Sequence, residues 1–151
     1  MEKFKEEKKM VYSDTHKFVV IVNKNLEAGR AFNAVAHSCA GLVALAPEEL
    51  REKMSFIDFP GKDGVMHNSI SGLSLIVLRG SNNELKKARR KFMENAIHYT
   101  DFTVTMTGDT YKEQLIKTEE TSEEDMEYFC VAAFGEKEVI DPITKRFSLW
   151  H

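Results

Sequence analysis

Residues 17–41 read KFVVIVNKNLEAGRAFNAVAHSCAG. The first seven form a continuous apolar run with four β-branched side chains, a pattern typical of a strand that is buried on both faces. A polar turn at 23–25 leads into an alanine-rich segment, which predicts a helix from about Ala28 to Ala46 that ends before Pro47. A buried strand followed directly by a long helix favours a layered α/β fold.

The segments after Pro47 continue this alternation of strand and helix patterns. The predicted strands are a hairpin with its turn at 61–64, buried strands at 73–78 and 128–135, and a strand with one solvent-exposed face at 101–106. The predicted helices are a short one at 47–50 and one from Glu84 to about Tyr99. Residues 118–127 are expected to form an exposed acidic helix or loop. We therefore expect a three-layer α/β sandwich, in which a mixed, mostly buried β-sheet carries helices on both faces.

The composition indicates one globular domain. Hydrophobic residues make up 42% of the 151 residues and charged residues 30%, a balance that supports one packed core. We expect a charged N-terminal extension at 1–16 and a single α/β domain at 17–151. No apolar run approaches the roughly 20 residues that a bilayer requires, and the opening MEKFKEEKKM has no signal-peptide core, so we expect a cytoplasmic protein with no membrane partner.

Charge and cysteine usage narrow the chemistry further. The net charge of −3 means that attraction to nucleic acid would have to come from a local basic patch. Cys39 and Cys130 lie far apart in apolar stretches, which is typical of reduced, buried thiols. The sequence has no CxxC motif, no Walker loop, no GxSxG and no HExxH, so we expect no metal and no cofactor.

The predicted helix at 28–46 has an unusual composition. A helical wheel predicts one apolar stripe that faces the core, formed by Phe32, Val35, Ala36, Cys39, Leu42, Val43 and Ala46. The opposite side collects small and polar residues, namely Arg30, Asn33, Ala34, His37, Ala40, Gly41 and Ala44. Asn33 and His37 stand one helical turn apart, so their side chains present hydrogen-bond donors and acceptors in one direction.

This polar and small-residue side has two interpretations. In the first it forms the floor of a pocket, where Arg30 and the backbone amides that follow Gly29 hold an anion and His37 serves as acid or base. In the second the small residues pack closely against a neighbouring element or a partner subunit, and Asn33 and His37 find structural hydrogen bonds there. The sequence leaves both open.

Two further segments are candidate sites. Four cations on the helix from Glu84 fall away from its apolar line and form a basic face that could contact RNA phosphates, namely Lys86, Lys87, Arg90 and Lys91. A solvated helix face explains them equally well. Residues 106–111, MTGDTY, place Asp109 and Thr110 on a loop just past a strand end, where α/β proteins tend to bind ligands, although a simple turn or helix cap has the same pattern.

The order of strand, Leu-x-x-Gly turn and alanine-rich helix in residues 17–41 resembles the opening of the type-2 peptidyl-tRNA hydrolases, and the closing VIDPITKRFSLW resembles the end of that family. The closer resemblance is to an uncharacterised, mainly bacterial group with that fold, number two thousand in the domain-of-unknown-function series. Its Gly-x-x-x-Asn-x-x-x-His signature is reproduced by Gly29, Asn33 and His37. The resemblance implies a fold like that of the type-2 peptidyl-tRNA hydrolases.

The chain departs from the true hydrolases at the start of this helix. Phe32 stands where those enzymes have a lysine implicated in catalysis, and an apolar ring supplies neither a positive charge nor proton donors. Asp109 and Thr110 match the Asp and Thr loop of the hydrolases only loosely, across a longer acidic insertion. The fold therefore carries over better than the chemistry.

These observations predict a protein of type-2 peptidyl-tRNA hydrolase-like fold that binds a small ligand or substrate at the Asn33 and His37 face. One alternative is a hydrolase that acts on an RNA-linked substrate. In that case the catalytic residues would be His37, Asn33 and Asp109, and the substrate-binding residues Arg30, Gly29 and Thr110. A second alternative is a homodimeric interaction module in which the small-residue face packs against a second copy.

Overall fold

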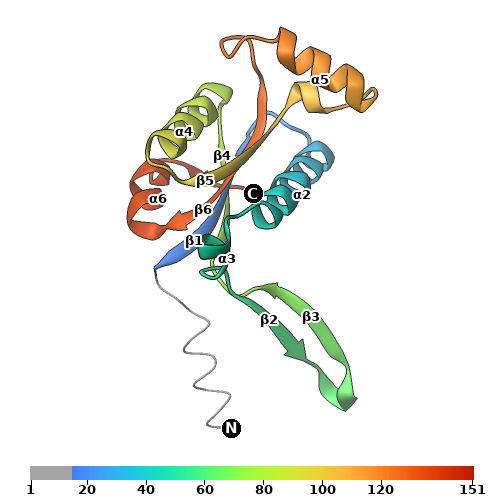
Figure 1. The fold of residues 1–151 in the computed structure, drawn as a ribbon, viewed down its shortest axis with the longest axis vertical. Coiled ribbons are helices and arrows are strands. Elements are labelled where there is room, and N and C mark those ends of the chain that lie inside the picture. The colour runs from blue at the N-terminus through green and yellow to red at the C-terminus, as the bar shows by residue number, and fades with distance from the viewer. Residues whose placement is uncertain (1–14) are drawn as a thin grey trace.

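The computed structural model describes residues 15–151, and its core is a five-stranded mixed sheet in the order β5-β6-β1-β4-β7 (Figure 1). The central strand β1 is parallel to β4 and antiparallel to β6, while β5 and the short β7 form the two edges. The strands are β1 (His16–Asn23), β4 (Leu75–Gly80), β5 (His98–Thr103), β6 (Tyr128–Glu136) and β7 (Ser148–Leu149). The expectation of a mixed sheet is confirmed.

Helices cover both faces of this sheet and give it three layers (Figure 1). Alternate residues of β1 point to opposite faces, so Phe18 and Val20 pack with α2 (Ala28–Ala44), whereas Val19 and Ile21 pack with α4 (Asn82–Glu94) and α6 (Lys137–Thr144). Both faces of β1 are apolar because both are buried, as the continuous run at 17–23 predicts.

The buried stripe of α2 differs from the stripe that the wheel predicts. The side chains against the sheet are Ala31, Ala34, Ser38 and Leu42, whereas Phe32 is 65% exposed and Ala36 is exposed. Placing Phe32 in the core and Ala34 on the open side was wrong. The reason is that small side chains at 31, 34 and 38 let the helix lie close to the sheet, so on this helix small size marks the buried face.

Several other boundaries also differ from expectation. The helix predicted to reach Tyr99 ends at Glu94, because Ala96 adopts a φ of 52° and the chain turns into β5. The strand expected at 101–106 is divided between β5 and the 3₁₀ turn η2 (Val104–Met106). A helix that the sequence did not predict, α5 (Tyr111–Glu120), precedes most of the acidic segment at 118–127, and α6 was also missed. The short helix α3 (Glu48–Arg51) follows α2 as expected.

The predicted hairpin is confirmed and stands apart from the main sheet. Strands β2 (Phe56–Pro60) and β3 (Met66–Ser71) form a separate two-stranded sheet that projects away from the body of the protein (Figure 1). The turn η1 (Lys62–Gly64) joins them, and Asp63 and Gly64 have φ angles of 60° and 79°. Such positive φ angles are what the Asp-Gly pair supplies.

The predicted N-terminal extension at 1–16 lies almost entirely outside the described residues. Within the described part of the chain, β1 already begins at His16, one residue before the predicted start of the domain. No helix among residues 15–151 is long and apolar enough to cross a membrane.

Candidate functional site

The open side of α2 forms one wall of a pocket of about 630 Å³, which we call the α2 pocket. Asn33, His37 and Gly41 line it from α2, and α5 closes it from the opposite side. Strand β5 and the loop after it form the remaining wall. The other lining residues are Ser38, Thr100, Asp101, Phe102, Met106, Thr107, Gly108, Tyr111, Gln114, Leu115 and Thr118.

Side chains of β5 hold α2 in place along this pocket. The Thr100 hydroxyl donates a hydrogen bond of 2.8 Å to the Ser38 carbonyl, and Nε2 of His98 lies 2.7 Å from the Leu42 carbonyl oxygen. Gly41 lies beside this contact, and a Cβ built there would make an ordinary van der Waals contact of 3.8 Å with the Thr100 methyl group. The wall that carries Asn33 and His37 is therefore fixed against the sheet by bonds to its own backbone.

The His37 imidazole packs against the ring of Phe102, and both residues line the pocket. The imidazole centroid lies 5.7 Å from that of Phe102, with the two rings tilted by 38°, and Phe102 in turn stacks on Phe129. His37 and Asn33 are both exposed, and neither side chain makes a hydrogen bond to any of residues 15–151. Their donors and acceptors are thus available to a bound molecule.

Most other polar side chains of the α2 pocket already have partners. The residues with such partners are Ser38, Thr100, Asp101, Thr107, Gln114 and Thr118. The Asp101 carboxylate accepts a bond of 2.8 Å from Nε of Arg89, whose guanidinium lies over the rings of Tyr99 and Tyr128. Among the described polar side chains that line the pocket, this leaves Asn33, His37 and the exposed Tyr111 without a hydrogen bond.

The two cysteines next to this wall are poor nucleophiles. Sγ of Cys130 lies 3.1 Å from the Ser38 hydroxyl, and burial raises the pKa of Cys130 to about 12 although the bond to Ser38 acts in the opposite direction. Burial also raises the pKa of Cys39. Because the thiolate is the reactive form, neither residue is activated at neutral pH.

Asp109 and Thr110 shape the loop that borders the α2 pocket, and they do not line it. Asp109 adopts a φ of 52° and forms an ion pair with Lys117. Thr110 is the N-cap of α5, where Glu113 accepts a bond of 2.8 Å from the Thr110 backbone N–H and completes a capping box. This geometry matches the turn-and-cap interpretation of the sequence.

The remaining predicted site residues lie outside the α2 pocket. Gly29 and Arg30 are exposed in the first turn of α2. On α4, the ammonium group of Lys86 donates to the Glu124 carbonyl at 2.6 Å, while Lys87 and Lys91 line a different groove and Arg90 is exposed. Within residues 15–151, no group of three or more His, Cys, Asp or Glu side chains is placed to hold a metal ion.

The wall formed by α5 was missed at the sequence level. It contributes Tyr111, Gln114, Leu115 and Thr118 to the pocket. The signal was present in the sequence, since Thr110 and Glu113 have the spacing of a capping box and Leu115 and Ile116 follow within one turn. The Gly108-Asp109 pair just before the cap favours a turn, which obscures the start of the helix.

Comparison with known proteins supports the description of the fold. The family described as "Protein of unknown function (DUF2000)" matches residues 16–151. Among solved structures, a protein of unknown function from Agrobacterium tumefaciens strain C58 superposes with a TM-score of 0.74 at 20% identity, covering 90% of this chain and 98% of that one. The two chains share the fold. No match was found among curated proteins.

Proposed function

The chain belongs to the family of unknown function DUF2000, and we propose that it binds a small molecule in the α2 pocket, with Asn33 and His37 as its polar contacts. The observation that carries the proposal is that both side chains line a pocket and have no hydrogen-bond partner among residues 15–151, although nearly all their polar neighbours do. We also propose, from the Leu26-x-x-Gly29 turn between β1 and α2, that the fold is that of the type-2 peptidyl-tRNA hydrolases.

The lining favours an uncharged ligand. No Lys or Arg lines the pocket, and its one carboxylate, Asp101, is paired with Arg89. Asn33 offers an amide donor and an acceptor, while Phe102 and Leu115 offer apolar surface. A molecule with an apolar body and an end that both donates and accepts, such as a carboxamide, fits this pattern. Arg30, one turn before Asn33, would contact any anionic part that extends beyond the pocket.

NMR titration with a library of small carboxamides and heteroaromatic amides tests the proposal. We expect the side-chain signals of Asn33 and His37 to shift with a common affinity, and Asn33→Ala and His37→Ala each to weaken binding about tenfold. Asn83→Ala and His67→Ala are matched controls, because both residues are exposed and lie outside the pocket. Equal losses in the control variants, or the absence of any hit that depends on Asn33 or His37, would contradict the proposal.

A hydrolase that acts on an RNA-linked substrate is a second candidate. The free imidazole of His37 beside the apolar ring of Phe102 favours it, because an unpaired histidine in a half-apolar site suits acid or base catalysis. Asp109 would join the site only if the loop that carries it released Lys117. Incubation with peptidyl-tRNA tests this candidate function. Peptide release by the wild-type protein that only equals release by His37→Ala would contradict it.

A homodimeric module is a third candidate, which the β2–β3 hairpin supports. Five of its apolar side chains are between 44% and 61% exposed, namely Phe56, Phe59, Val65, Met66 and Ile70. A two-stranded hairpin is marginally stable alone, so burial of these side chains against a second copy would stabilise it. Light scattering at several concentrations tests this, with Phe59→Ser plus Ile70→Ser expected to shift any dimer towards monomer.

A further inference from the structure

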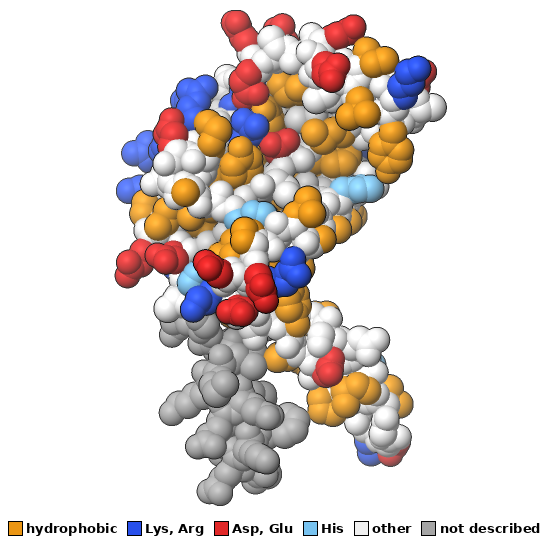
Figure 2. All heavy atoms as spheres, viewed as in Figure 1, with side chains coloured by type: hydrophobic (Ala, Val, Ile, Leu, Met, Phe, Trp, Pro, Cys, Tyr) orange, Lys and Arg blue, Asp and Glu red, His pale blue; other side chains and the backbone are white. Residues whose placement is uncertain are grey.

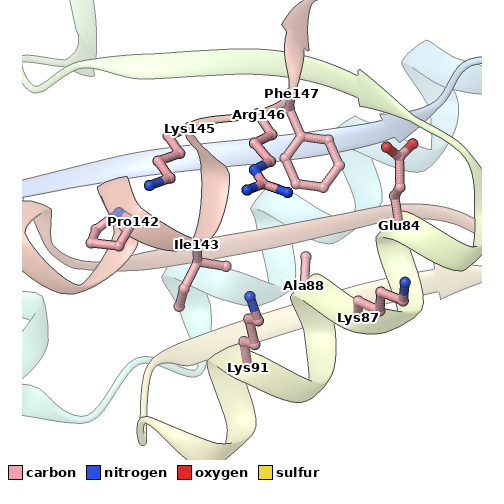
Figure 3. A pocket seen from close by; sticks show the side chains of 9 residues that line it. All are labelled: Glu84, Lys87, Ala88, Lys91, Pro142, Ile143, Lys145, Arg146 and Phe147. Atoms are coloured by element: carbon pink, nitrogen blue, oxygen red, sulfur yellow. The ribbon is translucent and has the colours of Figure 1, made fainter.

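A second cavity of about 530 Å³ lies on the other face of the sheet, between α4 and the end of α6 (Figure 3). We call it the α4–α6 groove. Four cations line it, Lys87 and Lys91 from α4 and Lys145 and Arg146 from the segment after α6. The groove thus gathers positive charge from two segments that are more than fifty residues apart in the sequence.

Two of the four cations face each other across the groove, and the other two lie at its margins. Figure 3 shows the Lys91 and Arg146 side chains extending toward each other from opposite walls beside Ala88, with Lys87 and Lys145 farther out on either side. On the face shown in Figure 2, Lys and Arg side chains gather over α4, whereas Asp and Glu side chains gather near α5 and near α3. The lining of the groove, with four cations and one carboxylate, is thus positive although the chain has a net charge of −3.

Some cations of the described residues are paired with carboxylates, whereas the four groove cations are exposed and have no such partner among these residues. Lys17, Arg89 and Lys117 each form an ion pair with a carboxylate. Within the described part of the chain, none of the four groove cations forms a salt bridge or donates a hydrogen bond. All four side chains are exposed, so their charges are accessible to a bound anion.

Glu84 is the single acidic side chain that lines the groove, and it has a structural role. Its carboxylate accepts a bond of 2.7 Å from the Ser81 backbone N–H as part of the capping box of α4. Hydrogen bonds from Ser81 lower the pKa of Glu84, so the carboxylate stays charged at the helix start. The lining still carries three positive charges in excess of negative ones.

The floor of the groove is apolar, and its aromatic ring is closely packed. Ala88 keeps it open, because its side chain is short, and Ile143 and Phe147 form the wall beside the cations. Gly80 fixes the Phe147 ring, since a Cβ built on Gly80 would lie only 2.6 Å from Cε1 of that ring. The groove therefore combines anion-binding groups with an aromatic surface in a space of small-molecule size.

We propose that the α4–α6 groove binds a small organic polyphosphate of the nucleoside triphosphate class. The phosphates lie between Lys91 and Arg146, with Lys87 and Lys145 neutralising the outer oxygens, and the apolar part of the ligand rests against Phe147. An RNA backbone shares the phosphate chemistry but requires cations along an extended track. In this structure Lys86, which would extend such a track along α4, is bonded to the Glu124 carbonyl.

Calorimetric titration of the full chain with ATP and with inorganic triphosphate tests the proposal at low and at physiological salt. The double variant Lys91→Ala plus Arg146→Ala is compared with Lys86→Ala plus Arg90→Ala, which also removes one Lys and one Arg but leaves the groove cations in place. We expect the first to weaken ATP binding about tenfold or more and the second to change it less than about twofold. Circular dichroism verifies that both variants fold.

The outcomes distinguish specific binding in the α4–α6 groove from binding to a general basic surface. Lys91→Arg keeps the charge and is expected to retain most of the affinity. Equal losses in the two double variants, or no ATP binding to the wild-type protein, would overturn the proposal. A single-stranded RNA that binds more tightly than ATP and responds equally to both double variants would also overturn it, because it would identify the whole face of α4 as an RNA surface.

Discussion

On one face of the sheet α2 packs through Ala31, Ala34 and Ser38, and on the other α4 packs through Leu85 and Phe92. The small side chains bring α2 so close that β5 bonds directly to its carbonyl groups, at Ser38 and Leu42. The large side chains hold α4 by filling the space between helix and sheet. The two faces show that a helix can be fixed by close backbone approach or by bulky side chains.

The manner of packing decides what each helix leaves on its outer side. With its small residues turned inward, α2 leaves Asn33 and His37 beside a pocket that no Lys or Arg lines and whose one carboxylate is paired. With its large residues turned inward, α4 leaves Lys87 and Lys91 beside a cationic groove. One sheet therefore separates two cavities of different chemistry. Substitutions on the two faces are expected to destabilise the protein for different physical reasons.

The largest effect is expected on the α4 face, where packing depends on volume. Phe92→Ala removes a fully buried ring and leaves a cavity between α4 and the sheet, so we expect the free energy of unfolding to fall by about 3–5 kcal/mol. Met93→Ala, next in sequence but 54% exposed, is the matched control and is expected to cost under about 0.5 kcal/mol. Urea denaturation measures both, and a small loss for Phe92→Ala would contradict this account of the α4 face.

The α2 face carries a buried thiol, which links its stability to alkaline pH. The pKa of Cys130 is raised from its ordinary 9.0 to about 12 in the folded protein, so folding favours the neutral thiol. The contribution of the neutral thiol to the free energy of unfolding is fully present below pH 9 and is lost as the pH rises from 9 towards 12. The wild-type protein is expected to lose about 1.4 kcal/mol per pH unit more than Cys130→Ala over this window, measured by denaturation at several pH values. Parallel curves for the two proteins would contradict the prediction.

Close approach on the α2 face predicts that adding volume there is costly. Ala34 is fully buried against the sheet, so Ala34→Leu forces α2 outward and is expected to cost about 1–3 kcal/mol. The control Ala36→Leu adds the same atoms at an exposed position two residues away and is expected to change stability by less than about 0.5 kcal/mol. If the helical-wheel prediction were right, Ala36→Leu would be the costly variant and Ala34→Leu would change stability little.

Much of the fold could be predicted from the sequence, because its strands carry strong local signals. The continuous apolar runs at 17–23 and 128–135 identify the central strand β1 and its neighbour β6, and Asp63 with Gly64 identifies the hairpin turn. The buried side of α2 could not be read in the same way. Hydrophobicity ranks Phe32 above Ala34, whereas the distance between helix and sheet, which no local pattern encodes, selects Ala34.

The candidate site was predictable only in part, for a similar reason. Asn33 and His37 share a helix, so their spacing alone places them side by side. The opposite wall comes from α5, more than seventy residues later in the chain, and only the tertiary fold brings its Gln114 and Leu115 across from α2. In the same way Lys87 and Lys91 were visible as a basic face, but their convergence with Arg146 depends on how α6 packs on α4.

The smallest effect concerns the loop that joins the sheet to the α5 wall, where Thr110 is either a helix cap or a ligand contact. The structure gives it a capping box with Glu113, so Thr110→Ala is expected to cost about 1 kcal/mol of stability. Thr110→Ser keeps the hydroxyl and is expected to retain the cap. If capping is its whole role, carboxamide titrations that shift the Asn33 and His37 signals will give unchanged affinities in Thr110→Ala at a temperature where the variant is fully folded.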